Sequence, residues 1–231
     1  MHPLHHAKSS AKRLGGNVED YLPVHAWMDE SKQAFCSPMH RAYRHNVEIL
    51  PELERLFGKH LASDPSISMK QVLDDHLMED CKGTTPSIVD WFIGIKPQAW
   101  MRKNADITTE DSAQLMANKF GGHASEYLAI CQYMNEGQSH PLLSGWRYRA
   151  WRWHSFATFD VERKFGVSFV NTAGRNVIVR YVAERHITSS LGRMPSMQDW
   201  YSTIKFQPFM AGNHVIAGSK VLDVVLADSN D

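Results

Sequence analysis

Histidine and aspartate residues recur at helical spacing in the first hundred residues of the chain. Eight of the 13 histidines fall within residues 1–101. His25 and Asp29 are four residues apart, as are His76 and Asp80, so each pair would share one face of a helix. Imidazole and carboxylate groups together suit Zn, Mn, Fe or Ni, and helical bundles build metal sites from such pairs. The spacing therefore indicates a divalent-metal site.

Further histidines and two arginines could complete this site. His6 lies in a His-rich N-terminal segment, and His40 and His45 are five residues apart, so they would approach from different directions. Arg41 and Arg44 are candidate catalytic residues, because guanidinium groups hold phosphoesters and other anions. The candidate metal ligands are His6, His25, Asp29, His40, His45, His76 and Asp80.

A structural interpretation remains open for the same residues. Histidines beside arginines can hydrogen-bond to carboxylates or backbone carbonyls without a metal, and the arginines could pair with acids such as Asp90 and Asp199. No GxSxG, HExxH, Walker or zinc-finger spacing occurs in the sequence. A metal-dependent site and a buried polar network are therefore both consistent with the sequence.

The chain repeats itself once. AKSSAKRLGGNVEDYL at residues 7–22 corresponds to AQLMANKFGGHASEYL at 113–128, and Arg-Ala-x-Arg at residues 41–44 recurs at 149–152. So many ordered matches predict a tandem duplication. The expected organisation is a first repeat at 1–101, a linker at 102–108, a second, degenerate repeat at 109–210 and a C-terminal tail at 211–231.

Comparison of the two repeats separates fold from chemistry. Both keep the glycines, prolines, tryptophans and the Arg-Ala-x-Arg frame, and His76 is matched by His186. The other candidate ligands are replaced in the second repeat, by Ser112, Cys131, Asn135, Tyr148, Trp153 and Ser190. This pattern predicts an active first repeat and a second repeat that serves as scaffold or interface.

The elements that must position these residues are mainly helical. Gly15 should end a first helix, and Pro23 should restart a helix after a short one. The longest helix should run from Pro38 to about Phe57, and Pro51 should kink it or split it in two. Minor β structure is expected as a hairpin near 167–182 and in a β-prone tail, and Trp91 and Trp200 should anchor the two cores.

Composition limits the partners. Lys plus Arg equals Asp plus Glu, so the net charge is zero and nonspecific nucleic-acid binding is not expected. No apolar run is long enough to span a bilayer, and three cysteines without CxxC spacing fit a reducing compartment. We expect a cytoplasmic protein, in a host cytoplasm or a virion if phage-encoded.

Several motifs resemble an uncharacterised family of small bacterial and phage proteins, a domain of unknown function that is usually single-copy. They are HPxxHxxxSxK, HRAxxH and PSxxDW, and they cover residues 1–101 well and the second repeat in degenerate form. The resemblance implies that the seven candidate ligands belong to the family pattern. It leaves two hypotheses: a metal-dependent hydrolase acting on a phosphoester or other anion, or a non-enzymatic phage structural protein that forms a homo-oligomer or binds a phage or host protein.

Overall fold

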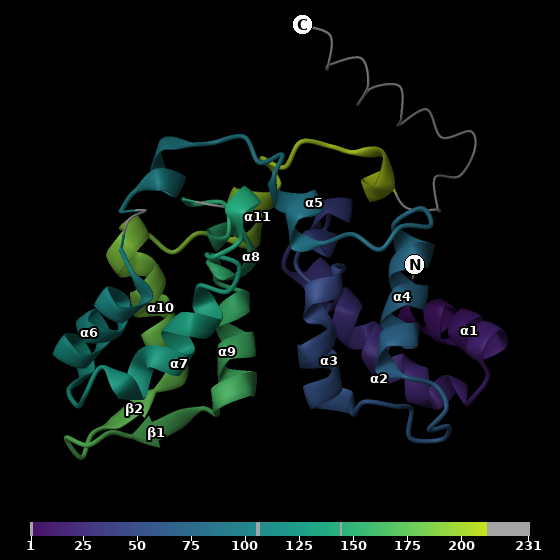
Figure 1. Cartoon of the computed structure of the whole chain (residues 1–231), viewed down its shortest axis with the longest axis horizontal. Coiled ribbons are helices and arrows are strands. Elements are labelled where there is room, and N and C mark those ends of the chain that lie inside the picture. Colours follow the sequence, from purple (N-terminus) through teal and green to yellow (C-terminus); the bar gives the residue numbers. More distant parts are fainter. Residues whose placement is uncertain (1, 105–106, 144, 212–231) are drawn as a thin grey trace, which may run out of the picture.

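The chain folds as two helical repeats that lie side by side (Figure 1). The computed structural model describes residues 2–104, 107–143 and 145–211, so residues 212–231 of the predicted β-prone tail lie outside it. The first repeat contains α1 (Pro3–Leu14), α2 (Val18–Asp29), η1 (Glu30–Gln33), η2 (Pro38–Ala42), η3 (Val47–Ile49), α3 (Leu50–Phe57), α4 (Met69–Asp80), α5 (Ile88–Phe92) and η4 (Ala99–Arg102). The second contains α6 (Thr109–Phe120), α7 (Ser125–Met134), η5 (Pro141–Leu143), α8 (Arg149–Arg152), α9 (Ala157–Phe165), β1 (Ser168–Val170), β2 (Asn176–Ile178), α10 (Val179–Leu191), α11 (Met197–Tyr201) and η6 (Pro208–Ala211).

A buried tryptophan anchors each repeat in the same way, as the sequence predicted. Trp91 and Trp200 are both fully buried. The indole Nε1 of Trp91 donates to the carbonyl of His45 at 2.8 Å, and that of Trp200 donates to the carbonyl of Trp153 at 2.7 Å. Because a buried indole N–H needs a partner, this bond fixes the Arg-Ala-x-Arg segment against the core in both repeats.

Local signals set several element boundaries as expected. Gly15 ends α1 with φ +93°, a conformation that favours glycine. Ser68 begins α4 through a capping box with Gln71, which fixes where His76 and Asp80 emerge. The predicted hairpin is present as antiparallel β1 and β2, with Ser168 paired to Ile178.

The predicted long helix from Pro38 to Phe57 is wrong. The segment is a 3₁₀-helix, a turn, a second 3₁₀-helix and then α3. Asn46 interrupts it in an extended conformation, and its side-chain amide donates to the carbonyls of Ala42 and Tyr43. Pro51 does not kink a helix but stands in the first turn of α3, where its missing N–H costs nothing. The irregular path turns His40 and His45 toward one side.

The predicted break at Pro23 is also wrong, because α2 continues through it. Pro23 lies in the interior of α2, where it removes one backbone hydrogen bond, and packing of the buried face compensates. This buried face consists of Tyr21, Val24, His25, Met28 and Asp29. His25 and Asp29 both follow Pro23 and lie on this face.

The two repeats meet through equivalent residues. Lys96 N donates to Thr203 O at 2.9 Å and Lys205 N donates to Gly94 O at 3.1 Å, on either side of an antiparallel bridge between Ile95 and Ile204. This reciprocal pattern is a pseudo-twofold contact, in which each repeat offers the same edge.

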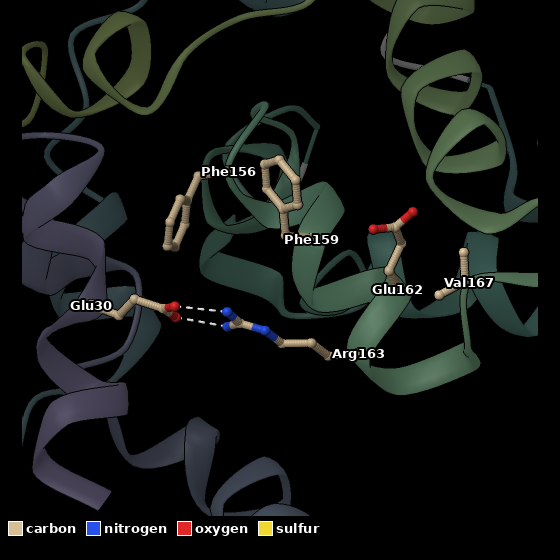
Figure 2. A pocket seen from close by; sticks show the side chains of 6 residues that line it. All are labelled: Glu30, Phe156, Phe159, Glu162, Arg163 and Val167. Carbon is tan, nitrogen blue, oxygen red and sulfur yellow. Dashed lines mark hydrogen bonds and ion pairs between the residues drawn. The ribbon is translucent and has the colours of Figure 1, made fainter. Parts of the chain in front are cut away.

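A buried ion pair between Arg44 of the first repeat and Asp160 of the second makes another contact between the repeats. Arg44 is fully buried, and its guanidinium donates to both oxygens of Asp160 in α9 at 2.8 and 2.7 Å, and to Glu30 at 2.9 Å. Tyr43 OH donates to the same Asp160 carboxylate at 2.6 Å. Figure 2 shows Arg163 of α9 reaching Glu30 with both terminal nitrogens.

Removing Asp160 should destabilise the chain strongly. Asp160→Ala leaves the buried Arg44 charge without its bidentate partner, so we expect a loss of about 3 kcal/mol in the free energy of unfolding. Asp74→Ala, which breaks the exposed pair between Lys70 and Asp74, is the matched control and should cost less than about 1 kcal/mol. Urea unfolding of both variants checks this; equal losses would contradict it.

The contact through Glu30 should weaken in acid. Hydrogen bonding from Arg163, opposed by burial and assisted by Arg44, lowers the pKa of Glu30 from 4.5 to about 2. Ionised Glu30 therefore stabilises the folded chain above pH 4.5, and this contribution is lost as the pH falls toward 2. The difference in unfolding free energy between wild type and Glu30→Gln should therefore shrink as the pH falls from 4.5 toward 2. A difference that does not change with pH would refute this.

Candidate metal centre

Four segments of the first repeat bring the predicted ligands into one buried region. His6 comes from α1, His25 and Asp29 from α2, His40 and His45 from the irregular segment, and His76 and Asp80 from α4. Each of these seven residues is 4% exposed or less. Ring contacts connect the histidines, from His6 to His76 at 4.4 Å between centroids and from His40 to His45 at 5.6 Å. The helical spacing read from the sequence thus corresponds to a real cluster.

Four of the seven form the inner group: Asp29, His45, His76 and Asp80, with one ligand atom each, all within 4.8 Å of one another. His45 Nε2 lies 2.9 Å from His76 Nε2, 3.2 Å from Asp80 Oδ2 and 3.5 Å from Asp29 Oδ1. Neighbouring ligands on one ion with bonds of about 2.1 Å stand roughly 3.0–3.4 Å apart. The three distances from His45 Nε2 are close to this spacing, so the inner group could close around a single transition-metal ion with small side-chain movements.

A chain of hydrogen bonds orients the ring of His76. His76 Nδ1 lies 2.7 Å from His25 Nδ1, His25 Nε2 lies 3.0 Å from Ser10 Oγ, and Ser10 Oγ donates to Asp75 at 2.6 Å. Since Asp75 only accepts, each group in turn donates toward it, and His76 carries its proton on Nδ1. The Nε2 lone pair of His76 then faces the inner group, as second-shell partners arrange for a metal ligand.

Burial and neighbouring charges shift the pKa values of two imidazoles and two carboxylates of the cluster toward the forms that bind metal. Burial, with neighbouring histidines, lowers the pKa of His76 well below its usual range and that of His25 to about 4. Burial alone would raise the pKa values of Asp29 and Asp80, but the hydrogen bond and charge of His45 lower both below their ordinary value. At neutral pH His25 and His76 are therefore neutral, as a metal ligand must be, and Asp29 and Asp80 are ionised.

Two cations stand at the edge of the inner group. Lys32 Nζ lies 2.9 Å from Asp29 Oδ1, and Arg41 Nε donates to Asp80 Oδ2 at 3.1 Å. Arg41 is therefore beside the candidate ligands, where it was predicted to act. It partly neutralises the carboxylates and offers a positive group next to any bound ion.

The structure places Arg44 elsewhere. Its guanidinium is taken up by Glu30 and Asp160 at the contact between the repeats, which argues against the anion-holding role predicted for it. The expected pairing of the arginines with Asp90 and Asp199 is wrong, because Arg41 pairs with Asp80 and Arg44 with Asp160. Asp90 and Asp199 accept from Ser87 and Ser196 in capping boxes, and Asp199 also pairs with Arg193, which is close in sequence.

The equivalent region of the second repeat has a different chemistry. His186 Nε2 hydrogen-bonds to Asn135 at 3.0 Å, and its ring packs edge-on against Trp153. Burial raises the pKa of the Cys131 thiol to about 12, so this cysteine stays protonated. Among the described residues, the inner group of the first repeat is the one set with metal-ligand separations.

Sequence reasoning missed the residues that surround the ligands. Glu79 accepts from His6 Nδ1 at 3.0 Å, and Ser31 Oγ lies 2.9 Å from His40 Nδ1. Glu79 is adjacent to Asp80, and Lys32 follows Asp29 by three residues, so position offered a signal for both. No sequence signal pointed to Ser10, because α1 and α4 come together only in the folded chain.

Ser10→Ala should destabilise the chain even without metal. It leaves His25 and Asp75 short of a buried partner, so we expect a loss of about 1–3 kcal/mol in the free energy of unfolding. Ser190→Ala is the matched control: this serine is equally buried, and its hydroxyl makes no hydrogen bond within the described part of the chain. Both are measured by urea unfolding in a chelator. A cost for Ser190→Ala as large as for Ser10→Ala would rule out this reading.

Comparison with known proteins gives a family and no activity. The model of a domain of unknown function (DUF6915) matches residues 1–101 and again 108–210. The chain therefore belongs to this family and carries its domain twice, which confirms the predicted duplication and the resemblance. No curated protein and no solved structure matches the chain. Among the described helices, none has the length and apolar character needed to cross a membrane.

Proposed function

We propose that the first repeat of this family member is a divalent-metal-binding domain, with the ion held by Asp29, His45, His76 and Asp80. The observation that carries this is the approach of His45 Nε2 to three other donor atoms at 2.9, 3.2 and 3.5 Å. Mixed imidazole and carboxylate ligands suit Zn, Mn, Fe or Ni.

A purely structural polar network is the competing interpretation, and the unpaired atoms speak against it. A network that serves stability should satisfy its buried members, because each unpaired polar atom is costly. Within the described residues, six buried side-chain atoms of this cluster make no hydrogen bond: His6 Nε2, Asp29 Oδ1, Asp29 Oδ2, His40 Nε2, His45 Nδ1 and Asp80 Oδ1. Of these, Asp29 Oδ1 lies within ion-pair distance of Lys32. A bound cation would explain several of them at once.

The activity that fits such a centre is metal-dependent hydrolysis of a phosphoester or another anionic substrate. A bound divalent ion acts as a Lewis acid and lowers the pKa of its water. Arg41 and Lys32, at the edge of the inner group, supply positive charge for an anion. Lys32 is about one-third exposed, so the Lys32 side is where substrate would approach.

The two repeats supply a matched test of metal binding. His76 and His186 occupy equivalent, fully buried helix positions. His76→Ala should lower the affinity for Zn²⁺ or Mn²⁺ more than about 100-fold, because it removes a ligand rather than an outer partner, whereas His186→Ala should leave it unchanged. Calorimetric titration of chelator-treated protein without an affinity tag measures both.

Two results would contradict the proposal. One is a folded wild-type chain that binds none of the four metals. The other is an equal loss of affinity in His76→Ala and His186→Ala. If metal binds as expected, hydrolysis of anionic esters is then assayed with the loaded wild type beside the His76 variant.

A non-enzymatic interaction role is the second candidate, and the surface of the second repeat favours it. Several large apolar side chains there are exposed, including Phe159 at 46%, Val167 at 69% and Val170 at 70%. Phe159 and Val167 line a pocket of about 430 Å³ beside the contact with the first repeat (Figure 2). An assembly or virion role, as the resemblance to phage proteins suggested, would use this surface. A folded chain without metal affinity would favour this candidate.

A further inference from the structure

We propose that the centre is dinuclear, with a second ion bound by His6 Nε2, Asp29 Oδ2 and Asp80 Oδ1. The two aspartates would then bridge the ions, each through both of its oxygens. This inference rests on the proposed function, since it adds a second ion to the first.

The orientation of His6 is the first argument. Its Nδ1 lies 3.0 Å from Glu79 Oε2, and since a carboxylate accepts, Nδ1 carries the proton. The other ring nitrogen, Nε2, is directed at two carboxylate oxygens, 3.5 Å away on Asp80 and 3.9 Å away on Asp29. A cation between these three atoms would offset the cost of burying two carboxylate oxygens near one another.

The same three atoms lack other partners. His6 Nε2, Asp29 Oδ2 and Asp80 Oδ1 are all buried, and none of them makes a hydrogen bond within the described residues. A protonated Nε2 could in principle donate to Asp80, but the separation of 3.5 Å exceeds the usual 2.7–3.2 Å for such a bond. Separations of 3.5 and 3.9 Å are somewhat longer than the spacing of neighbouring ligands, but they stay below the limit of about 4.2 Å for two ligands of one ion with bonds of about 2.1 Å.

Each carboxylate divides its oxygens between the two positions. Asp29 turns Oδ1 toward His45 at 3.5 Å and Oδ2 toward His6 at 3.9 Å. Asp80 turns Oδ2 toward His45 at 3.2 Å and Oδ1 toward His6 at 3.5 Å. Carboxylates arranged in this way bridge two ions, and pairs of ions about 3.5–4 Å apart are typical of phosphatases and nucleases. Among the anionic substrates proposed above, the arrangement thus favours phosphoesters.

The outer partners are arranged for the same purpose. Glu79 orients His6, as the chain through His25 and Ser10 orients His76. Each of these two imidazoles therefore has its Nδ1 proton fixed and its Nε2 directed inward. A histidine that served only packing would need neither device.

Counting bound ions tests the second position. Chelator-treated wild type is titrated with Zn²⁺ and with Mn²⁺, and the bound metal is measured by elemental mass spectrometry after gel filtration. We expect two ions for each wild-type chain and one for His6→Asn. Asparagine keeps an amide N–H near the position of Nδ1, so the contact with Glu79 is retained. The second-repeat variant His186→Ala is the control and should hold two ions.

The outcomes separate this inference from the proposed function. One ion in both wild type and His6→Asn overturns the dinuclear centre and leaves the first site standing. No ion in wild type overturns both. A loss of both ions in His6→Asn, with the fold intact, assigns His6 to a single site and also contradicts the inference.

A measurement on the unaltered chain covers the case in which His6→Asn does not fold. The electron paramagnetic resonance spectrum of wild type loaded with excess Mn²⁺ and then desalted is recorded. Two carboxylate-bridged ions should give an exchange-coupled spectrum, whereas a single ion gives the six-line pattern of isolated Mn²⁺. A six-line spectrum at full intensity for the bound metal would refute the second site.

Discussion

A carboxylate without solvent must be compensated by its surroundings, and Asp80 is such a carboxylate at the centre of the first repeat. It is fully buried, and groups from three segments approach it: His6 from α1, Arg41 and His45 from the irregular segment, and His76 within its own helix. The first helix and the irregular segment therefore each contribute a polar group to α4. The geometry of the cluster follows from this requirement.

The second repeat shows that the frame does not need this arrangement in order to fold. It keeps the tryptophan anchor and the helix order, yet Ser190 stands where Asp80 does, and Trp153 stands where His45 does. Apolar replacement of buried charges is commonly neutral or stabilising. Burying two ionised aspartates among imidazoles therefore costs free energy that the second repeat avoids by filling the same region with aromatic side chains. The metal site proposed for the first repeat would account for these buried charges.

Local signals in the sequence predicted much of the fold. Gly15, Ser68 and the hairpin act through neighbouring residues, so they can be read directly. The spacing of His25 with Asp29 and of His76 with Asp80 correctly placed each pair on one helix face, because both helices are regular. The prolines were harder to interpret. Pro23 lies in the interior of α2 without ending it, whereas Pro51 lies in the first turn of α3.

Long-range pairings could not be predicted. Arg44 meets Asp160, which is 116 residues away along the chain, and nothing near either residue signals the other. Asp90 and Asp199 were predicted to pair with the arginines of the repeated frame, but they accept hydrogen bonds from capping serines instead. Ser10 and Glu79 orient two candidate ligands. They lie on different helices, α1 and α4, which come into contact only in the folded chain.

The reciprocal edge formed by Lys96 and Lys205 has an evolutionary meaning. A self-complementary contact of this kind is what two identical subunits make in a symmetric homodimer. A single-domain relative with the same edge would pair with itself and carry one cluster in each subunit. Fusion of the two copies makes the partner permanent at high effective concentration. It also lets the halves change independently, so that one can keep the costly carboxylates while the other becomes its covalently attached support.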